Sequence, residues 1–180
     1  MSDTRILSTA GPQEGALVDV LERLRNRFFG KYRGIVDRVD PSTMRIKAKV
    51  PAVLGDQVSG WARACTPYAG NGFGFAFLPD AGSGVWIEFE GGDASLPIWS
   101  GCYWHDGEAP PDATATVMAL VTKAKQKILF DVDQGSITIE DQNGNTITID
   151  DSGVTLSRGG QSVAVSDGSV SVNDGALKVT

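Results

Sequence analysis

The chain has 180 residues, of which 22 are glycine and 41% are hydrophobic, and its formal net charge is −6 at pH 7. This glycine content favours turn-rich β-structure over a helical bundle, and the acidic balance disfavours nucleic acid as a partner, because DNA and RNA require clustered Lys and Arg. No apolar stretch approaches the roughly 20 residues of a membrane helix, and no secretory signal is recognisable. We therefore expect a protein that is soluble where it is made.

The first predicted element is an amphipathic helix within residues 1–30. Its apolar positions recur at i, i+4, i+7 and i+11, at Leu17, Leu21, Leu24 and Phe28, and the helix is expected to end near Gly30. Such a helix either covers a neighbouring β-domain or serves self-association and docking. Its charge does not separate these two interpretations.

Residues 31–105 are predicted to form a small barrel of the OB type. Five short strands fall in YRGIVDRV, MRIKAKVP, GWARACTP, SGVWIEFE and SLPIWSGCYW, with a long glycine-rich loop between the third and the fourth. All four tryptophans lie in this region, and we expect them to give the domain a core that it buries alone. Cys65 and Cys102 are expected to be buried free thiols, with a disulfide as the alternative.

The remaining chain is predicted to be a linker, residues 106–116, followed by a repetitive β-structure, residues 117–180. Glycines recur every seven to nine residues from Gly135 onward, as expected for hairpin-like turns. Between successive turns lie two apolar residues two positions apart. These are the predicted core positions of the repeat: Ile137, Ile139, Ile147, Ile149, Val154, Leu156, Val163, Val165, Val170, Val172, Leu177 and Val179.

One copy of this repeat cannot bury its own apolar face. Each aliphatic side chain contributes about 1.5–3 kcal/mol when fully buried, whereas ordering the roughly eight residues of a repeat costs on the order of 8–16 kcal/mol in backbone entropy. No Trp, Tyr or Phe follows Phe130, so the interior must be narrow. We predict that three copies wrap around one axis as a trimeric β-helix or β-prism, the alternative being a single-chain β-meander packed on the barrel.

The acidic residues suggest no chemical site. Six acids and no base lie between residues 131 and 151, which is typical of a solvated face that discourages edge pairing. The segment DQNGN departs from the EF-hand spacing, so no metal is predicted. His105, the only histidine, is expected to face solvent beside Asp106 and Glu108, and we predict neither a catalytic residue nor a cofactor.

A binding module is the alternative function. OB barrels bind oligosaccharides or single-stranded nucleic acid through one face. Arg45, Lys47 and Lys49 alternate on one predicted strand and therefore share a face. In a net acidic protein, these three residues are more simply explained by solvent or a neighbouring subunit.

The run LPDAGSGVWIEFEGGDASLPIWSGCYW resembles the barrel of the phage baseplate assembly protein V and VgrG families. The matching residues are Pro79, Gly82, Phe89, Gly92, Asp93, Pro97, Ile98 and Gly101. Upstream, YRGIVDRVDPSTMRIKAKVP resembles the opening strand pair of these families, and the repeat resembles their β-helical needle. The resemblance implies a homotrimeric central spike in a phage tail baseplate, a tailocin or a related extracellular injection particle, which pierces the target cell envelope when the sheath contracts.

Three differences from the family shape the expected partners. Unlike many members of the family, the protein is expected to carry no lysozyme-like domain or effector extension. It lacks the His-x-His pair that binds iron at the apex of some short spikes, so the resemblance implies a blunt needle capped by a separate PAAR-type tip protein. Residues 1–30 are too short for the large hub portion of VgrG proteins, which implies a separate tube-hub protein.

Overall fold

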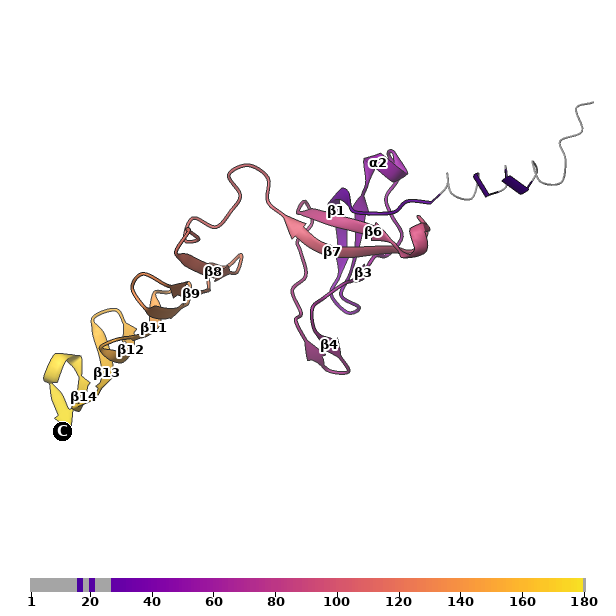
Figure 1. Cartoon of the computed structure of the whole chain (residues 1–180). Helices are drawn as coiled ribbons and strands as arrows, with labels where there is room; N and C mark the ends of the chain where they lie inside the picture. Colours follow the sequence, from indigo (N-terminus) through magenta and orange to yellow (C-terminus); the bar gives the residue numbers. More distant parts are fainter. Residues whose placement is uncertain (1–15, 18–19, 22–26, 180) are drawn as a thin grey trace, which may run out of the picture. The chain divides into compact units, whose positions relative to one another are not determined.

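A computed structural model of the chain describes residues 16–17, 20–21 and 27–179, and it divides the chain into two compact units, residues 1–105 and 106–180 (Figure 1). Most of the predicted N-terminal helix lies outside the described residues. Those described within it, Ala16, Leu17, Val20 and Leu21, are helical and exposed. Phe28 was predicted to lie on this helix, but it is not helical. Its ring lies 6.2 Å from that of Phe89 and packs on the barrel.

The first unit is a small five-stranded barrel, as predicted. Its sheet has the order β2-β1-β6-β7-β3, with β3 parallel to β7, and a bridge between Ile46 and Ala62 brings the chain before β3 back to β2. This order and the parallel closing pair are those of an OB barrel. The strands are β1 (Tyr32–Asp40), β2 (Arg45–Lys49), β3 (Arg63–Ala64), β6 (Gly84–Phe89) and β7 (Pro97–Tyr103).

Three features of this unit were not predicted. A short helix, α2 (Pro51–Leu54), follows β2, with Pro51 at its start. The glycine-rich loop contains a small hairpin, β4 (Ala69–Gly70) and β5 (Phe73–Gly74), and a 3-10 turn, Glu90–Gly92, joins β6 to β7. A two-residue strand pair leaves too short an alternating pattern to be recognised in a sequence.

The barrel core is mainly aliphatic, and the prediction of a tryptophan core is wrong. Ile46, Val50, Val85 and Ile87 are fully buried, whereas only Trp99 among the tryptophans is buried. Trp61 and Trp104 are exposed. The reason is the two-residue period of a strand: Trp86 lies between the buried Val85 and Ile87 and therefore faces outward. The cysteine prediction is also corrected, because Cys65 and Cys102 are free but exposed.

The second unit is one antiparallel sheet of eight strands, in which each strand pairs with the next along the chain. At one of its turns, Gly153 has φ +132, and a Cβ there would collide with the carbonyl oxygen of Val165. The strands are β8 (Val117–Val121), β9 (Lys127–Asp131), β10 (Ser136–Glu140), β11 (Asn145–Asp150), β12 (Gly153–Arg158), β13 (Gln161–Ser166), β14 (Ser169–Val172) and β15 (Leu177–Val179), with a 3-10 turn at Asn173–Gly175.

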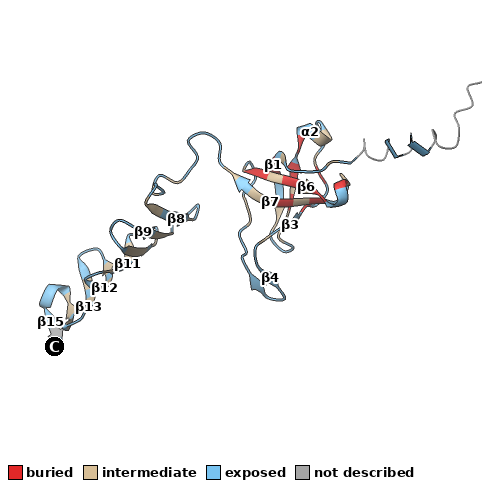
Figure 2. Cartoon of the chain, in the orientation of Figure 1, coloured by how far each residue is buried: buried red, intermediate tan, exposed pale blue. Residues whose placement is uncertain are grey.

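This second unit has no buried core within one chain. Among residues 106–177 and 179, none is buried, whereas the barrel strands carry buried residues (Figure 2). Within one chain the repeat is therefore a single-layer meander, not a β-helix. A prism or helix requires further copies of the chain and stays a prediction.

Candidate functional site

Two rows of apolar side chains cross the eight-stranded sheet on one face. The strand register places each apolar residue directly opposite an apolar residue of the next strand, so their side chains form continuous lines. Row A consists of Leu120, Ile128, Ile139, Ile147, Leu156, Val163, Val172 and Leu177. Row B consists of Met118, Phe130, Ile137, Ile149, Val154, Val165, Val170 and Val179.

All twelve core positions predicted from the repeat lie in these two rows. Four members were missed in the sequence: Met118 and Leu120 on β8, and Ile128 and Phe130 on β9. They show the same spacing of two positions, and this signal was present in the sequence. The apolar face therefore begins two strands earlier than the repeat had indicated.

The rows are largely uncovered by their own chain. The exposed fractions are 45% for Phe130, 43% for Ile139 and 47% for Leu156. Large contiguous apolar patches on soluble proteins mark interaction sites. A face of two such rows over eight strands is therefore a candidate protein interface.

From β10 to β14 the opposite face of the sheet is polar or small, whereas β8 and β9 place Val117, Val121 and Leu129 on it. Thr138 pairs with Thr148, and Thr148 with Thr155, followed along the sheet by Ala164 and Ser171. Cross-strand threonine pairs suit a face in contact with water. The sheet therefore has one face for solvent and one for a partner.

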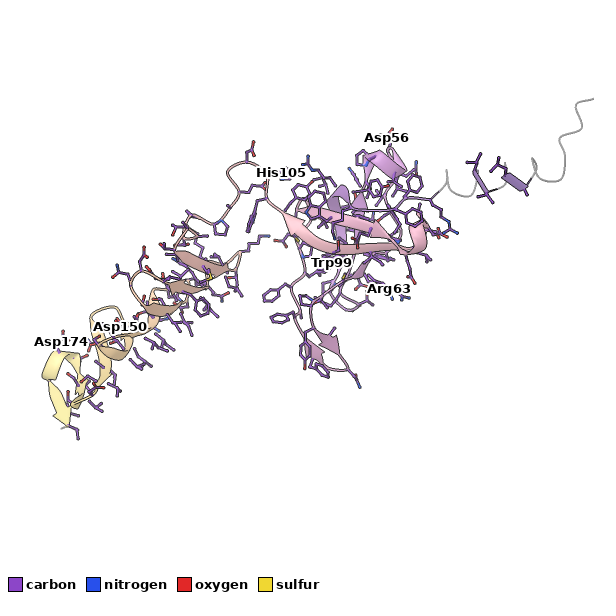
Figure 3. The ribbon with its side chains drawn as sticks, in the orientation of Figure 1. Asp56, Arg63, Trp99, His105, Asp150 and Asp174 are labelled. Carbon is purple, nitrogen blue, oxygen red and sulfur yellow. The ribbon has the colours of Figure 1, made fainter. Side chains whose placement is uncertain are left out.

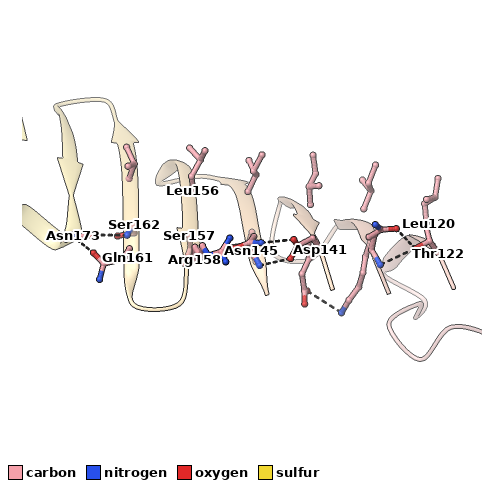
Figure 4. Close-up of a pocket in the computed structure, with 18 of the residues that line it drawn as sticks. Leu120, Thr122, Asp141, Asn145, Leu156, Ser157, Arg158, Gln161, Ser162 and Asn173 are labelled. Atoms are coloured by element: carbon pink, nitrogen blue, oxygen red, sulfur yellow. Dashed lines mark hydrogen bonds and ion pairs between the residues drawn. The ribbon is translucent and has the colours of Figure 1, made fainter. Parts of the chain in front are cut away.

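A third row, which we call the polar row, runs beside row A on the same face and consists of Thr122, Gln126, Asp141, Asn145, Arg158 and Gln161 (Figure 4). Short hydrogen bonds link some of its members to each other or to Asn173 beside the row. The Asn145 Nδ2 donates to Asp141 Oδ2 at 2.6 Å, and the Asn173 Nδ2 donates to Gln161 Oε1 at 2.6 Å. Row A and the polar row together line a groove of about 840 Å³.

Asp141 organises the turn between β10 and β11. Its carboxylate accepts hydrogen bonds from the backbone N–H and side-chain amide of Asn145, and also from those of Asn143. These donors, led by the Asn145 backbone N–H, lower the pKa of Asp141 to about 2. This carboxylate is the first residue of the segment DQNGN, and its hydrogen bonds give it a structural role there.

The family-like residues of the barrel shape its turns. Gly82, with φ +91, donates its N–H to Val36 O before β6, and Pro97 opens β7. Asp93 accepts the backbone N–H and the hydroxyl of Ser95, and these bonds lower its pKa. Gly92 has φ +77 and receives the Phe28 N–H on its carbonyl oxygen. A Cβ at Gly92 would meet the Phe28 nitrogen at 3.1 Å.

Pro79 lies in the loop before Gly82, and Gly101, with φ +144, lies on β7. Neither Pro79 nor Gly101 has a side chain that could take part in catalysis. Within the described residues, no three His, Cys, Asp or Glu side chains cluster as a metal site would require.

The other candidates from the sequence are placed on the barrel. Arg45, Lys47 and Lys49 share one side of β2, opposite the buried Ile46 and Ala48, and the Lys47 ammonium lies 5.3 Å from the Trp61 ring centre. Stacking of bases would need a row of exposed aromatic rings beside these charges, and the described contact is that of Lys47 with Trp61.

His105 lies at the end of the first unit (Figure 3). Its ring packs edge-on against Tyr103 at 5.3 Å. No described helix of the chain is long and apolar enough to cross a membrane.

Comparisons with known proteins match both units. Residues 32–104 match the Type VI secretion system/phage-baseplate injector OB domain, and residues 117–178 match the phage baseplate V C-terminal trimerisation domain. The Type VI secretion system spike protein VgrG4b of Pseudomonas aeruginosa and the actin cross-linking toxin VgrG1 of Vibrio cholerae serotype O1 are each 38% identical over 56 residues, or 31% of this chain. The match covers 7% and 5% of those two proteins, so the chain spans a small part of their length.

Proposed function

The chain belongs to the family of phage-baseplate V and VgrG-like spike proteins, and we propose that it is the central spike of a contractile injection machine, assembled as a homotrimer through rows A and B. One observation carries this proposal. The apolar rows, which the described residues of their own unit leave largely exposed, lie almost wholly within residues 117–178, the range that matches a trimerisation domain.

The dimensions of the sheet favour three walls around a narrow axis. Five-residue strands are about 17 Å long and eight strands stack to about 34 Å. If the strands run across each wall, a triangle with 17 Å sides leaves about 5 Å from wall to axis, which Ile, Leu and Val side chains fill. If the strands instead run along the axis, each wall is about 34 Å wide and the distance from wall to axis is about 10 Å. Aliphatic side chains are too short to fill that space. The stack therefore runs along the axis.

In this proposal the needle works through shape and stiffness. Burial of aliphatic faces between chains makes unfolding of one wall depend on all three chains. When the sheath contracts, the rigid trimer is driven through the target envelope. No residue is assigned a chemical step, in keeping with a family of structural spike and baseplate proteins.

The partners are proposed from the family. A separate tube-hub protein would contact the barrels, and a PAAR-type protein would cap the end of the needle. The particle is a phage tail baseplate, a tailocin or a related injection particle assembled after synthesis in the cytoplasm. Copurification of the chain with the products of neighbouring genes tests these partners separately from the trimer.

Burial of row A tests the proposed trimer directly. We expect a cysteine introduced by Ile147→Cys, in a background with Cys65→Ser and Cys102→Ser, to react with maleimide only after unfolding. Thr148→Cys, one residue away on the polar face, is the control and is expected to react in the native protein. Equal native labelling at both positions would contradict burial of row A between chains.

A further inference from the structure

The strand ends of the eight-stranded sheet form two rims of opposite charge. The turns β9–β10, β11–β12 and β13–β14 form the acidic rim, which carries no Lys or Arg and has the charged residues Asp131, Asp133, Asp150, Asp151 and Asp167. The turns at the other ends form the basic rim. It carries every described base of this unit except the one on β15, at Lys123, Lys125, Lys127 and Arg158, together with Glu140, Asp141 and Asp174.

Most charges of the basic rim are already engaged within the chain. The Lys127 ammonium lies 3.2 Å from Asp112 and 3.3 Å from Glu140, and Asp141 is held by the amides of its own turn. Arg158 differs from them. It is exposed at the end of β12, and no carboxylate of the described residues pairs with it.

The acidic rim offers partners that are likewise exposed. Asp151 lies in the β11–β12 turn and Asp167 in the β13–β14 turn, and both are exposed. Neighbouring strands of the sheet lie about 4.8 Å apart. Along the direction in which the strands stack, one of these turns lies just before β12 and the other just after it. Arg158 lies at the other end of β12, on the basic rim.

A closed ring of three identical walls brings these rims together. All three chains run in the same direction, so every edge of the prism joins the basic rim of one chain to the acidic rim of the next. A rotation about the axis does not shift heights along it. Arg158 of one chain therefore faces the interval between Asp151 and Asp167 of the neighbouring chain.

We propose that a second copy of this chain occupies the basic rim, with Arg158 of each chain paired to Asp151 and Asp167 of the next in a cyclic set of three contacts. This inference rests on the proposed trimer and adds to it the contact that joins the walls. The complementary charges of the two rims favour closure in one direction around the axis and oppose pairing of like rims.

A charge swap between two versions of the chain tests the contact. One version carries Arg158→Glu, the other carries Asp151→Arg and Asp167→Arg, and the two bear tags of different mass. Each homotrimer then has three repulsive contacts, whereas each mixed trimer has two attractive contacts and one repulsive contact. After coexpression in equal amounts, we expect native mass spectrometry to find the ratio of mixed trimers to homotrimers raised about twofold or more above the ratio for random mixing, in line with weak exposed ion pairs.

The outcomes separate this contact from the trimer itself. Two wild-type chains with the same tags are the control and should mix at random. Random mixing of the charge-swapped chains would overturn the Arg158 contact while leaving the trimer intact. Absence of trimers in the wild type would instead overturn the proposed function.

A milder variant covers the case in which the swapped chains fail to fold. Arg158→Gln keeps hydrogen-bonding groups and removes the charge. We expect the dissociation of its trimer to depend less on salt concentration than that of the wild type. The variant lacks the three Arg158 ion pairs, which salt would otherwise screen. An unchanged salt dependence would overturn the contact.

Discussion

At the scale of single residues, substitutions in rows A and B show whether this apolar face is exposed to solvent or buried between chains. Ile139→Asp places a carboxylate that is harmless in a solvent-exposed sheet, but in a trimer it buries three unpaired charges, at a cost of several kcal/mol each. We expect this variant to lose the trimer in light scattering. Thr138→Asp, on the polar face, is the matched control, and trimers in both variants would contradict a shared core.

The carboxylate of Asp141 gives a pH-dependent prediction. Its pKa is lowered from 3.8 to about 2, so the folded state favours the charged form. Its contribution to stability is complete above pH 4 or so and is lost as the pH falls through about 2. We expect Asp141→Asn to lower the thermal midpoint at pH 7, with the difference from wild type narrowing over that range.

The control for this variant is Asp56→Asn, on the exposed loop after α2. It is expected to leave the midpoint unchanged at pH 7. A difference between wild type and Asp141→Asn that persists unchanged at pH 2 would show that the turn does not depend on the charge.

At the scale of elements, the two units should respond differently to core truncation. Ile87 is fully buried in the barrel, and Ile87→Ala should cost about 2–5 kcal/mol of unfolding free energy. The loss should not depend on protein concentration. Ile147→Ala should lower a transition whose midpoint rises with concentration, because folding of that sheet is coupled to association. Denaturant titrations at two concentrations measure both effects.

The sequence allowed some of these elements to be predicted and others not. The strands of the barrel and the spacing of the repeat follow from two-residue alternation and regular glycines, and the residues of rows A and B could be read from the same pattern. The position of Trp99 inside and Trp61 outside could not, since Trp61 precedes the two-residue strand β3, which leaves no alternating pattern to assign its side. The partner of the apolar face is a separate chain, so no pattern within one chain fixes its geometry.

At the scale of the whole molecule, the two units have different requirements for a buried core. The barrel has its own core of residues such as Ile46 and Ile87. The eight-stranded sheet has none within one chain. A protein of this kind should be a folded monomer when it ends after the barrel and an oligomer when the sheet is present.

The most direct test is the solution mass of the purified chain, measured by light scattering, together with that of a version ending at Asp112. We predict a mass near three times 19.0 kDa for the full chain and a folded monomer for the shortened version. A monomeric full chain, with rows A and B left in water, would contradict the shared core and the spike proposed from it.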